Sequence, residues 1–490
     1  MLDRQPLLIS MLVTPYCTNL FDNPQELYQY LLEVKQQCLP KKSLKILSIS
    51  QEIPLIDPLA VLQAIAKPDQ LHFYFEKPAQ KEAIAAINAV DFIKIEGEDR
   101  FKKAQAFIQN CLTKTTSIGA FNLPFHGSHF FCSFTFFDQL NNSTSPFPSA
   151  TIFLPRWQVA CRGNRAVVVA NTEINPTSNI EKLTEELWQT FNIIKKIAIE
   201  KHTVTSNLLK LDIAPRNNLF KKDIAEIEKL KSSILNILSL VESKKINKVV
   251  LAHALDVISP IHFHFIASLN HLRKRYPDCY IFSTSNGIGQ NFIGASPERL
   301  INIHNQKLIT DALAGSAPRG KTADEDAELA NKLLTSEKER HEHQVVSDFI
   351  IQCLSKLGLS PEMSPTPQLL QLLNIQHLWT PIQANVPTGV HPLEIVAELH
   401  PTPAVAGTPR EISQEQIRRY ETFDRGLYAA PLGWVDHRGN SEFIVGIRSA
   451  LIDGDRARLY AGAGIVAGSD PDKEVAEIQL KLQALLKALV

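Results

Sequence analysis

The sequence lacks an excess of either charge, any C-x-x-C pair and any long apolar run. Its 51 basic and 51 acidic side chains cancel, so the net charge gives no reason to expect nucleic acid or an anionic membrane as partner. The seven cysteines are scattered, which argues against a zinc ribbon or a disulfide framework and indicates reduced thiols in a cytoplasm. No run reaches the roughly 18 apolar residues of a membrane span, and the short apolar run at 7–13 predicts a strand rather than a signal peptide.

What is present is ordinary for a globular protein. The chain has 490 residues, of which 44% are apolar and 21% charged, enough to bury a large core. In the first 200 residues, short strands alternate with helices. Strands are predicted at 7–13, 71–75, 90–94, 130–136, 150–154 and 166–170, and helices at 24–37, 80–87, 100–111 and 180–201. No group of residues in this part forms a catalytic pattern, so we expect it to supply strands of the sheet and walls of the site.

The second half has longer periodic segments. A helical pattern from Asp223 leads into an apolar strand that begins at Lys248, and consecutive strands are predicted from 279 to 309. One helix is predicted from 323 to about 357, and paired strands from 432 to 461. This pattern favours an α+β protein. We predict one folded unit with two poorly separable halves, 1–215 and 216–490.

The last segment, from 459 to 490, carries the most regular pattern. We expect a strand to end near Tyr460, with Gly462 and Gly464 letting the backbone approach a bound group. Ser469 or Asp470 can cap a helix that begins at Pro471. At helical spacing, one stripe of this helix is apolar and a second stripe beside it is charged. The apolar stripe is Val475, Ile478, Leu482, Leu485 and Leu489, and the charged one is Glu474, Glu477 and Lys481.

Several charged residues admit both an ordinary and a functional interpretation. Glu477 and Lys481 match an i,i+4 surface pair, Lys248 could be a solvated strand end, and Glu298 could be an exposed turn acid or could be aimed inward by Pro297. Glu342 is more informative, because it shares an apolar helical stripe with Val346, Phe349 and Cys353. A carboxylate in that position needs a cation or a raised pKa.

Nine segments in order resemble the chorismate-utilising family, the isochorismate, salicylate, anthranilate and aminodeoxychorismate synthases. They are KVVLA, GASPERL, ALAGS, RHEHQVV, HLWT, LHPTPAV, RGLYAAPLGW, IRSA, and YAGAGIV followed by Glu474, Glu477 and Lys481. The match runs from about Asn247 to the C-terminus. It implies two packed antiparallel β-sheets surrounded by helices, with the site in a cleft. One departure is His253, where the family often has arginine.

Three positions sort the chemistry within that family. Members that add water to chorismate have lysine at the position of Lys248. Ala314 stands where aminodeoxychorismate synthases have a nucleophilic lysine, and Ala404 resembles isochorismate synthases. The resemblance therefore implies an isochorismate synthase, an isomerase in menaquinone or siderophore synthesis, without a glutaminase partner. A salicylate synthase, an ammonia-dependent aminating subunit and a non-catalytic chorismate-binding protein remain alternatives, and the oligomeric state is not readable.

The resemblance also implies a role for each site residue. Lys248 would be the general base and Glu298 the general acid. Mg²⁺ would be held by Glu342, Glu474 and Glu477. The expected substrate contacts are Ala314, Gly315, Ser316, His377, Ala404, Val405, Ile447, Arg448, Tyr460, Gly462 and Lys481.

Overall fold

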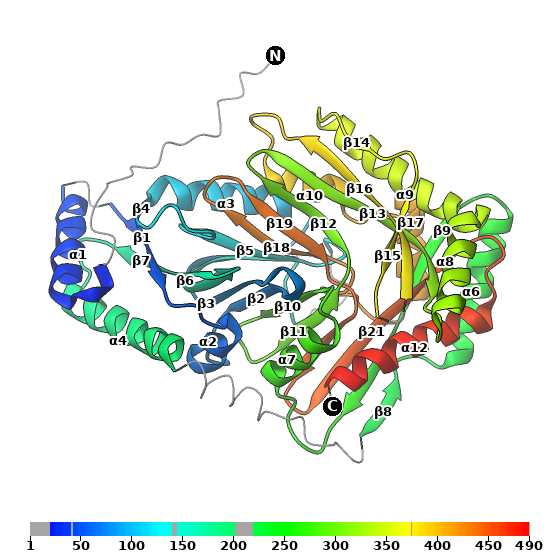
Figure 1. Cartoon of the computed structure of the whole chain (residues 1–490), viewed down its shortest axis with the longest axis horizontal. Helices are drawn as coiled ribbons and strands as arrows, with labels where there is room; N and C mark the ends of the chain where they lie inside the picture. The colour runs from blue at the N-terminus through cyan, green and yellow to red at the C-terminus, as the bar shows by residue number, and fades with distance from the viewer. Residues whose placement is uncertain (1–19, 41–42, 140–144, 201–218, 374, 490) are drawn as a thin grey trace.

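The computed structural model describes residues 20–40, 43–139, 145–200, 219–373 and 375–489. The predicted strand at 7–13 lies outside these residues. In Figure 1, α1 (Pro24–Cys38) and α4 (Ile180–Ile199) lie at one end of the molecule. The helices α8 (Ala323–Thr335), α9 (Glu337–Lys356) and α12 (Pro471–Leu489) lie at the other end.

All the described strands belong to one hydrogen-bonded network that branches at the long strand β6 (Ala150–Arg162). One edge of β6 pairs with β3 (Glu82–Ile95), and the other edge pairs first with β5 (His129–Phe134) and then with β7 (Arg165–Ile174). β7 continues the sheet to β1 (Lys45–Ile53), which pairs in parallel with β4 (Thr115–Gly119). β6 therefore starts two long arms, one through β3 and one through β5.

The first arm leads from β3 towards the last strands of the chain, through antiparallel pairs. Its order after β3 is β2 (His72–Lys77), β10 (Tyr280–Ser285), β11 (Asn291–Ser296), β20 (Ser449–Asp453), β21 (Arg456–Ile465), β9 (Lys248–Ile258) and β8 (Phe220–Asp223). The short β17 (Gly407–Thr408) pairs with the start of β9.

The second arm, from β5, is also antiparallel. Its order is β18 (Pro431–Asp436), β19 (Ser441–Val445), β12 (Arg299–His304), β13 (Lys307–Pro318) and β16 (Ile375–Asn385), which also pairs with β14 (Glu362–Met363) and β15 (Gln368–Gln371). Two of the places where the chain crosses between the arms are close to each other. Glu298 lies at the β11–β12 crossing and Arg448 at the β19–β20 crossing, where the Glu298 carbonyl oxygen accepts a hydrogen bond from the Val445 N–H.

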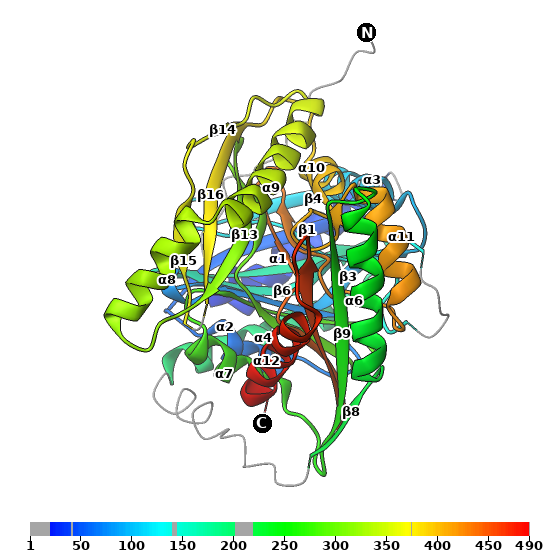
Figure 2. The same ribbon diagram turned by 90° about the vertical axis from the view of Figure 1, so that its right-hand side faces the viewer.

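Helices cover the outer surfaces of both arms. The first arm carries α6 (Ile227–Glu242), α7 (Phe265–Arg275), α11 (Arg410–Tyr420) and α12, and Figure 2 shows α6, α11 and α12 beside β9 and β21. α9 packs on β13, and α10 (Pro392–Leu399) lies between α9 and α3 (Arg100–Lys114). α2 (Pro58–Ile65) packs against β3. The predicted α+β class is confirmed, and the two antiparallel β-sheets that the resemblance implies are two arms of one hydrogen-bonded network.

The sequence of the last helix, α12, determines how it lies on the sheet. Asp470 caps it, since its Oδ1 accepts hydrogen bonds from the backbone N–H groups of Asp472 and Lys473. All five residues of its predicted apolar stripe are buried, so the helix lies against the sheet along that stripe. The charged stripe then lies at the edge of the covered face.

Three local predictions were wrong. The helix predicted at 80–87 is absent: Gln80 ends a short 3-10 helix (Pro78–Gln80), and 82–87 are the start of β3, because the small apolar side chains from Ala83 to Ile87 are buried in a strand paired with β2 and β6. The helix predicted from 323 to 357 is two helices, since Ser336 ends α8 and caps α9 through its Oγ. The strand at Tyr460 does not end there, because Gly462 and Gly464 continue β21 beside β9.

No helix within the described residues is both long and apolar enough to cross a bilayer.

Candidate active site

A cavity of about 280 Å³ lies between the ends of the two sheet arms. The first arm contributes Lys248 from β9 and Tyr460 from β21, and the second contributes Ala314 from β13 and His377 from β16. Every residue that the sequence analysis assigned to catalysis, metal or substrate lines this cavity. The fold thus brings together residues from Lys248 to Lys481, although their individual roles stay predictions.

Lys248 and Glu342 form an ion pair in this cavity that is less exposed than the pair of Lys481 and Glu477. The Lys248 Nζ donates to the Glu342 Oε1 at 2.6 Å, and the side chains are 6% and 18% exposed. Burial acts to raise the pKa of Glu342, but the charge and hydrogen bond of Lys248 outweigh it and lower this pKa. Gly464 makes room for the amine, since a Cβ atom there would lie 2.8 Å from the Lys248 Cε. Lys248 is therefore the cation that a carboxylate on an apolar stripe requires.

Glu298 differs from the other acids in the cavity. It is 6% exposed, and its backbone N–H donates to the Ser296 Oγ at 3.2 Å. Burial raises the pKa of Glu298 to about 7, with Lys248 opposing the shift and Asp311 adding to it. The carboxyl therefore retains its proton close to neutral pH, as a general acid must.

The charged stripe of α12 faces the same cavity. The Lys481 Nζ lies 2.6 Å from the Glu477 Oε1 and donates to the Gly462 carbonyl oxygen at 2.9 Å. This is an i,i+4 pair, but the second bond fixes the ammonium against β21. Burial raises the pKa of Glu474, which lines the cavity one turn before.

Two charged residues of the cavity were missed by the sequence analysis. Lys338 and Glu339 line it from the first turn of α9. The Glu339 Oε2 accepts a hydrogen bond from the Ser316 N–H at 3.0 Å, and the Ser316 Oγ lies 2.7 Å from the His377 Nδ1. The spacing of Glu339, three residues before Glu342, was the signal that could have identified it.

The remaining wall of the cavity has one residue with an uncommon backbone conformation and two stacked tyrosine rings. Arg448 has φ 49°, an uncommon backbone conformation for a non-glycine residue, and its side chain is partly exposed. The rings of Tyr428 and Tyr460 stack with centroids 5.3 Å apart. Tyr428 was also missed by the sequence analysis. These groups give the cavity one flat aromatic side and one cationic side.

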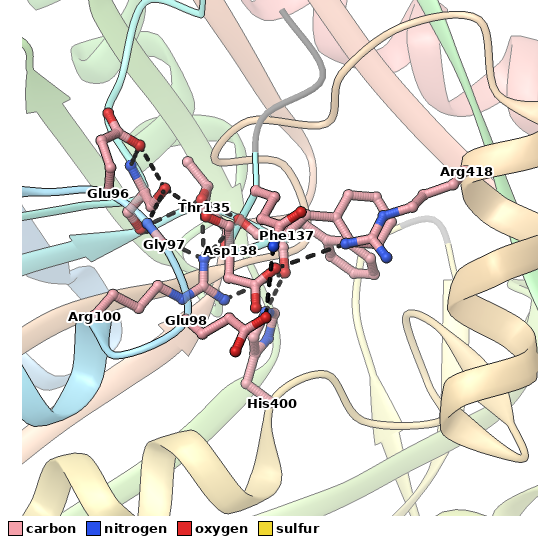
Figure 3. Close-up of polar contacts among 12 residues, drawn as sticks. Glu96, Gly97, Glu98, Arg100, Thr135, Phe137, Asp138, His400 and Arg418 are labelled. Carbon is pink, nitrogen blue, oxygen red and sulfur yellow. Dashed lines mark hydrogen bonds and ion pairs between the residues drawn. The ribbon is translucent and has the colours of Figure 1, made fainter.

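The LHPTPAV segment that carries Ala404 is held by the N-terminal half (Figure 3). The His400 Nε2–H donates to the Phe136 carbonyl oxygen at 3.0 Å. The buried Arg100 guanidinium donates to the carbonyl oxygens of Thr135 and Phe137 at 2.8 and 2.7 Å, and so also fixes this loop. The loop after β5 is therefore a support for one wall of the cavity.

Arg425 ties this wall to the strand that carries Lys248. Its guanidinium donates to the carbonyl oxygens of Val405 and Val250 at 2.9 and 2.8 Å and pairs with the Glu421 carboxylate. The Phe136 ring lies 4.3 Å from the guanidinium carbon. The side chains of Arg425 and Glu421 are 0% and 3% exposed, so this is a fully buried ion pair that connects three segments.

Replacing Arg425 with Leu is expected to destabilise the protein by about 3–5 kcal/mol, because it leaves the Glu421 carboxylate buried and unpaired. Urea unfolding followed by circular dichroism measures the change. Arg418→Leu is the matched control, since Arg418 contacts Asp138 at 3.6 Å and both side chains are about one-third exposed. The control is expected to cost about 0–1 kcal/mol, and equal losses in both variants would contradict the argument.

The donor set of the cavity fits a hard divalent cation. Glu339, Glu342, Glu474 and Glu477 offer oxygen ligands beside Glu298, and a further anion would be repelled unless a cation neutralised these groups. Among the described residues, no three His, Cys, Asp or Glu side chains already form a metal cluster. Mg²⁺ does not need one, because it retains waters and uses one or two carboxylates together with oxygens of its substrate.

These features define a class of enzyme with a polar, carboxylate-lined cleft between two sheet arms. The profile of the family described as "Chorismate binding enzyme" matches residues 33–490. The chain belongs to this family, which confirms the resemblance found in the sequence.

Three relatives of known name are isochorismate synthases. The "Salicylate biosynthesis isochorismate synthase" of Pseudomonas aeruginosa is 45% identical over 221 residues, 45% of this chain and 46% of that protein. Isochorismate synthase MenF of Bacillus subtilis is 38% identical over 251 residues, 51% of this chain and 53% of that protein. The chain thus spans about half the length of these relatives. Isochorismate synthase EntC of Escherichia coli K12 is 31% identical over 323 residues, 65% of this chain and 80% of that protein.

Solved structures match over more of the chain. The menaquinone-specific isochorismate synthase MenF of Escherichia coli aligns with a TM-score of 0.72 and 25% identity, over 94% of this chain and all of that one. Anthranilate synthase component I of Streptococcus pneumoniae aligns with a TM-score of 0.65 and 19% identity, over 83% and 92%. The second match shows the fold alone.

Proposed function

We propose that the protein is an isochorismate synthase that converts chorismate reversibly into isochorismate with Mg²⁺. The observation that carries the proposal is a buried acid with a pKa near 7, Glu298, in the same cavity as a lysine, Lys248. An exchange of hydroxyl position needs one group to deprotonate water and another to protonate the departing hydroxyl. The names of the relatives support the same activity.

Lys248 is the proposed general base and Glu298 the proposed general acid. Lys248 takes a proton from water while the water oxygen bonds to ring carbon 2 and the ring double bond migrates. The C–O bond at carbon 4 breaks, and that hydroxyl leaves as water with the proton of Glu298. Proton exchange with solvent resets both groups. No atom is gained or lost overall, so the reaction is an isomerisation.

The ion pair with Glu342 sets a condition on the base. The Lys248 Nζ donates to the Glu342 Oε1 at 2.6 Å, so Lys248 is available to act on water only when Glu342 is engaged elsewhere. Glu342, Glu474 and Glu477 are the proposed ligands of Mg²⁺, which when bound anchors and neutralises the ring carboxylate of chorismate. Glu342 would thus have two alternative partners, the Lys248 ammonium and the cation, and Lys248 would lose its ion pair when Glu342 holds the cation.

The remaining contacts orient chorismate. Arg448 and Lys481 are proposed to bind the enolpyruvyl carboxylate, since both are cations on the cavity wall. Burial lowers the pKa of His377 to about 3, so a neutral imidazole faces the ring. Backbone groups of Gly315, Ser316 and Gly462 complete the polar contacts, and apolar and aromatic side chains form the walls, Ala314, Ala404, Val405, Ile447 and Tyr460.

Product analysis tests the proposal. Purified protein with chorismate and Mg²⁺ is expected to yield isochorismate alone, separated by chromatography from salicylate and aminated products. A lactate dehydrogenase-coupled assay detects pyruvate, which an isomerase does not release. Pyruvate together with salicylate would instead indicate a salicylate synthase, and an aminated product with ammonium an aminating subunit.

Metal removal is expected to abolish turnover. EDTA-treated protein, after removal of the chelator, should convert chorismate at a few per cent of the untreated rate or less, and added Mg²⁺ should restore it, because the carboxylates otherwise repel the substrate dianion. Steady-state rates before and after Mg²⁺ addition measure the effect. Full activity without the metal would contradict the ligand assignment.

We further propose that the protein acts in the cytoplasm, without a glutaminase partner, and that 1–215 serves mainly to support the catalytic half at 216–490. The names of the relatives refer to menaquinone, salicylate and vibriobactin, so its isochorismate could enter quinone or siderophore synthesis. Deleting the gene and testing growth with added quinone or under iron limitation separates these two pathways.

A further inference from the structure

A second cavity, of about 600 Å³, is larger than the catalytic one and shares none of its described lining residues. It lies where the C-terminal part of α3, the loop before α10 and the β18–β19 turn meet. Its volume is within the range of small-molecule sites. Isochorismate chemistry uses none of its groups.

One wall of this cavity is aromatic. The rings of Phe121 and His126 lie edge to face with centroids 5.6 Å apart, and those of His126 and His437 are 5.1 Å apart at 66°. Gly127, with φ +72°, permits this arrangement, because a Cβ atom there would lie 2.5 Å from the His437 ring. A flat ring would pack well against such a wall.

Two of the polar groups of the cavity are buried histidines, which offer ring nitrogens without negative charge. His126 is 4% exposed, and neither of its ring nitrogens has a hydrogen-bond partner among the described residues. The His391 Nδ1 accepts from the Leu393 N–H, so the ring proton of the neutral imidazole is on Nε2. Burial lowers the pKa of His126 and His391 to about 3 and 4, which keeps both neutral.

The cation at this cavity is Arg438. Its side chain is 50% exposed and lies 3.9 Å from the Asp436 Oδ2. The Asp436 carboxylate is already occupied, since it accepts from the backbone N–H groups of Arg438 and Asn440 and from the Asn440 side chain. The guanidinium therefore keeps donors for a planar anion.

We propose that this cavity is a second small-molecule site that takes an aromatic carboxylate. The ring of the ligand would pack between the aromatic wall and the apolar residues of α3, and its carboxylate would meet Arg438 and the His391 Nε2–H. The site is independent of the proposed catalytic reaction. It does contact the catalytic wall through one element, because α10 begins after His391 and ends at Leu399, the first residue of the LHPTPAV segment.

The test uses 2-naphthoate as probe and the full-length protein. Calorimetric titration is expected to give saturable binding of one equivalent, unchanged by saturating chorismate and Mg²⁺. Arg438→Gln should weaken this binding by about tenfold, because it removes the charge that meets the carboxylate. Arg456→Gln, at an exposed arginine that does not line the cavity, should leave it unchanged.

The proposal would be overturned by the absence of saturable binding, by displacement of 2-naphthoate by chorismate, or by equal weakening in the two arginine variants. The neutral 2-naphthamide should bind more weakly than 2-naphthoate, and equal affinity would exclude a carboxylate site. Since Arg438 is half exposed, its replacement is not expected to prevent folding, and product analysis with chorismate tests the catalytic site separately.

Discussion

Glu298→Gln is expected to lower kcat by about 10²–10⁴-fold, the usual contribution of a general acid. Glutamine keeps the shape of the side chain but has no acidic proton for the hydroxyl that leaves carbon 4. Chorismate binding, measured by calorimetry with Mg²⁺, should change little. Stopped-time product analysis provides kcat.

The dependence of kcat/KM on pH is an independent test of Glu298 as the general acid. Burial raises the pKa of Glu298 to about 7, and the acid works only while protonated. In the wild type, kcat/KM should therefore fall as the pH rises through about 7, and the residual activity of Glu298→Gln should lack this falling limb. Glu339→Gln, at another carboxylate of the same cavity, is the control and should retain the limb. A Glu298→Gln variant with the wild-type kcat would exclude Glu298 as the general acid.

Lys248→Ala is expected to lower kcat by a similar factor, about 10²–10⁴-fold, because no other amine replaces the base. The truncation leaves space beside Gly464, so added methylamine should restore part of the rate with isochorismate as the product. Rates at increasing methylamine concentration measure this rescue. Magnesium-dependent chorismate binding should persist.

Lys338→Ala is the matched control, since Lys338 lines the same cavity from α9 but has no proposed proton to move. It should keep most of the turnover and show no response to methylamine. Turnover by Lys248→Ala at the wild-type rate would remove Lys248 from the mechanism. A rescue of equal size in both variants would show that methylamine acts through solvent rather than at position 248.

The sequence predicted those parts of the site in which local pattern and tertiary position agree. The stripe from Val475 to Leu489 determined which side of α12 would be buried, and this placed Glu474, Glu477 and Lys481 at the edge of the covered face. Glu342 was recognised because a carboxylate on an apolar stripe needs a cation, and Lys248 supplies it. The motifs of the family then connected these separate segments.

Other parts depend on contacts that no local pattern reveals. The alanine-rich segment 80–87 has good helix propensity, but pairing with β2 and β6 overrides it. The break at Ser336 did carry a signal, since S-x-x-E is a capping pattern and the Ser336 Oγ accepts from the Glu339 N–H. The contact between the Phe136 ring and the Arg425 guanidinium joins residues 289 positions apart in the sequence, and no local sequence pattern predicts it.

The branched strand network has a consequence for synthesis of the protein. β5 is completed by β18, and β2 by β10, so strands made early on the ribosome wait for partners that lie much later in the sequence. Until residues 431–436 emerge, β5 has an apolar edge without its neighbour, and such edges favour aggregation. Nascent chains stalled before β18 should consequently depend on chaperones more strongly than the finished protein.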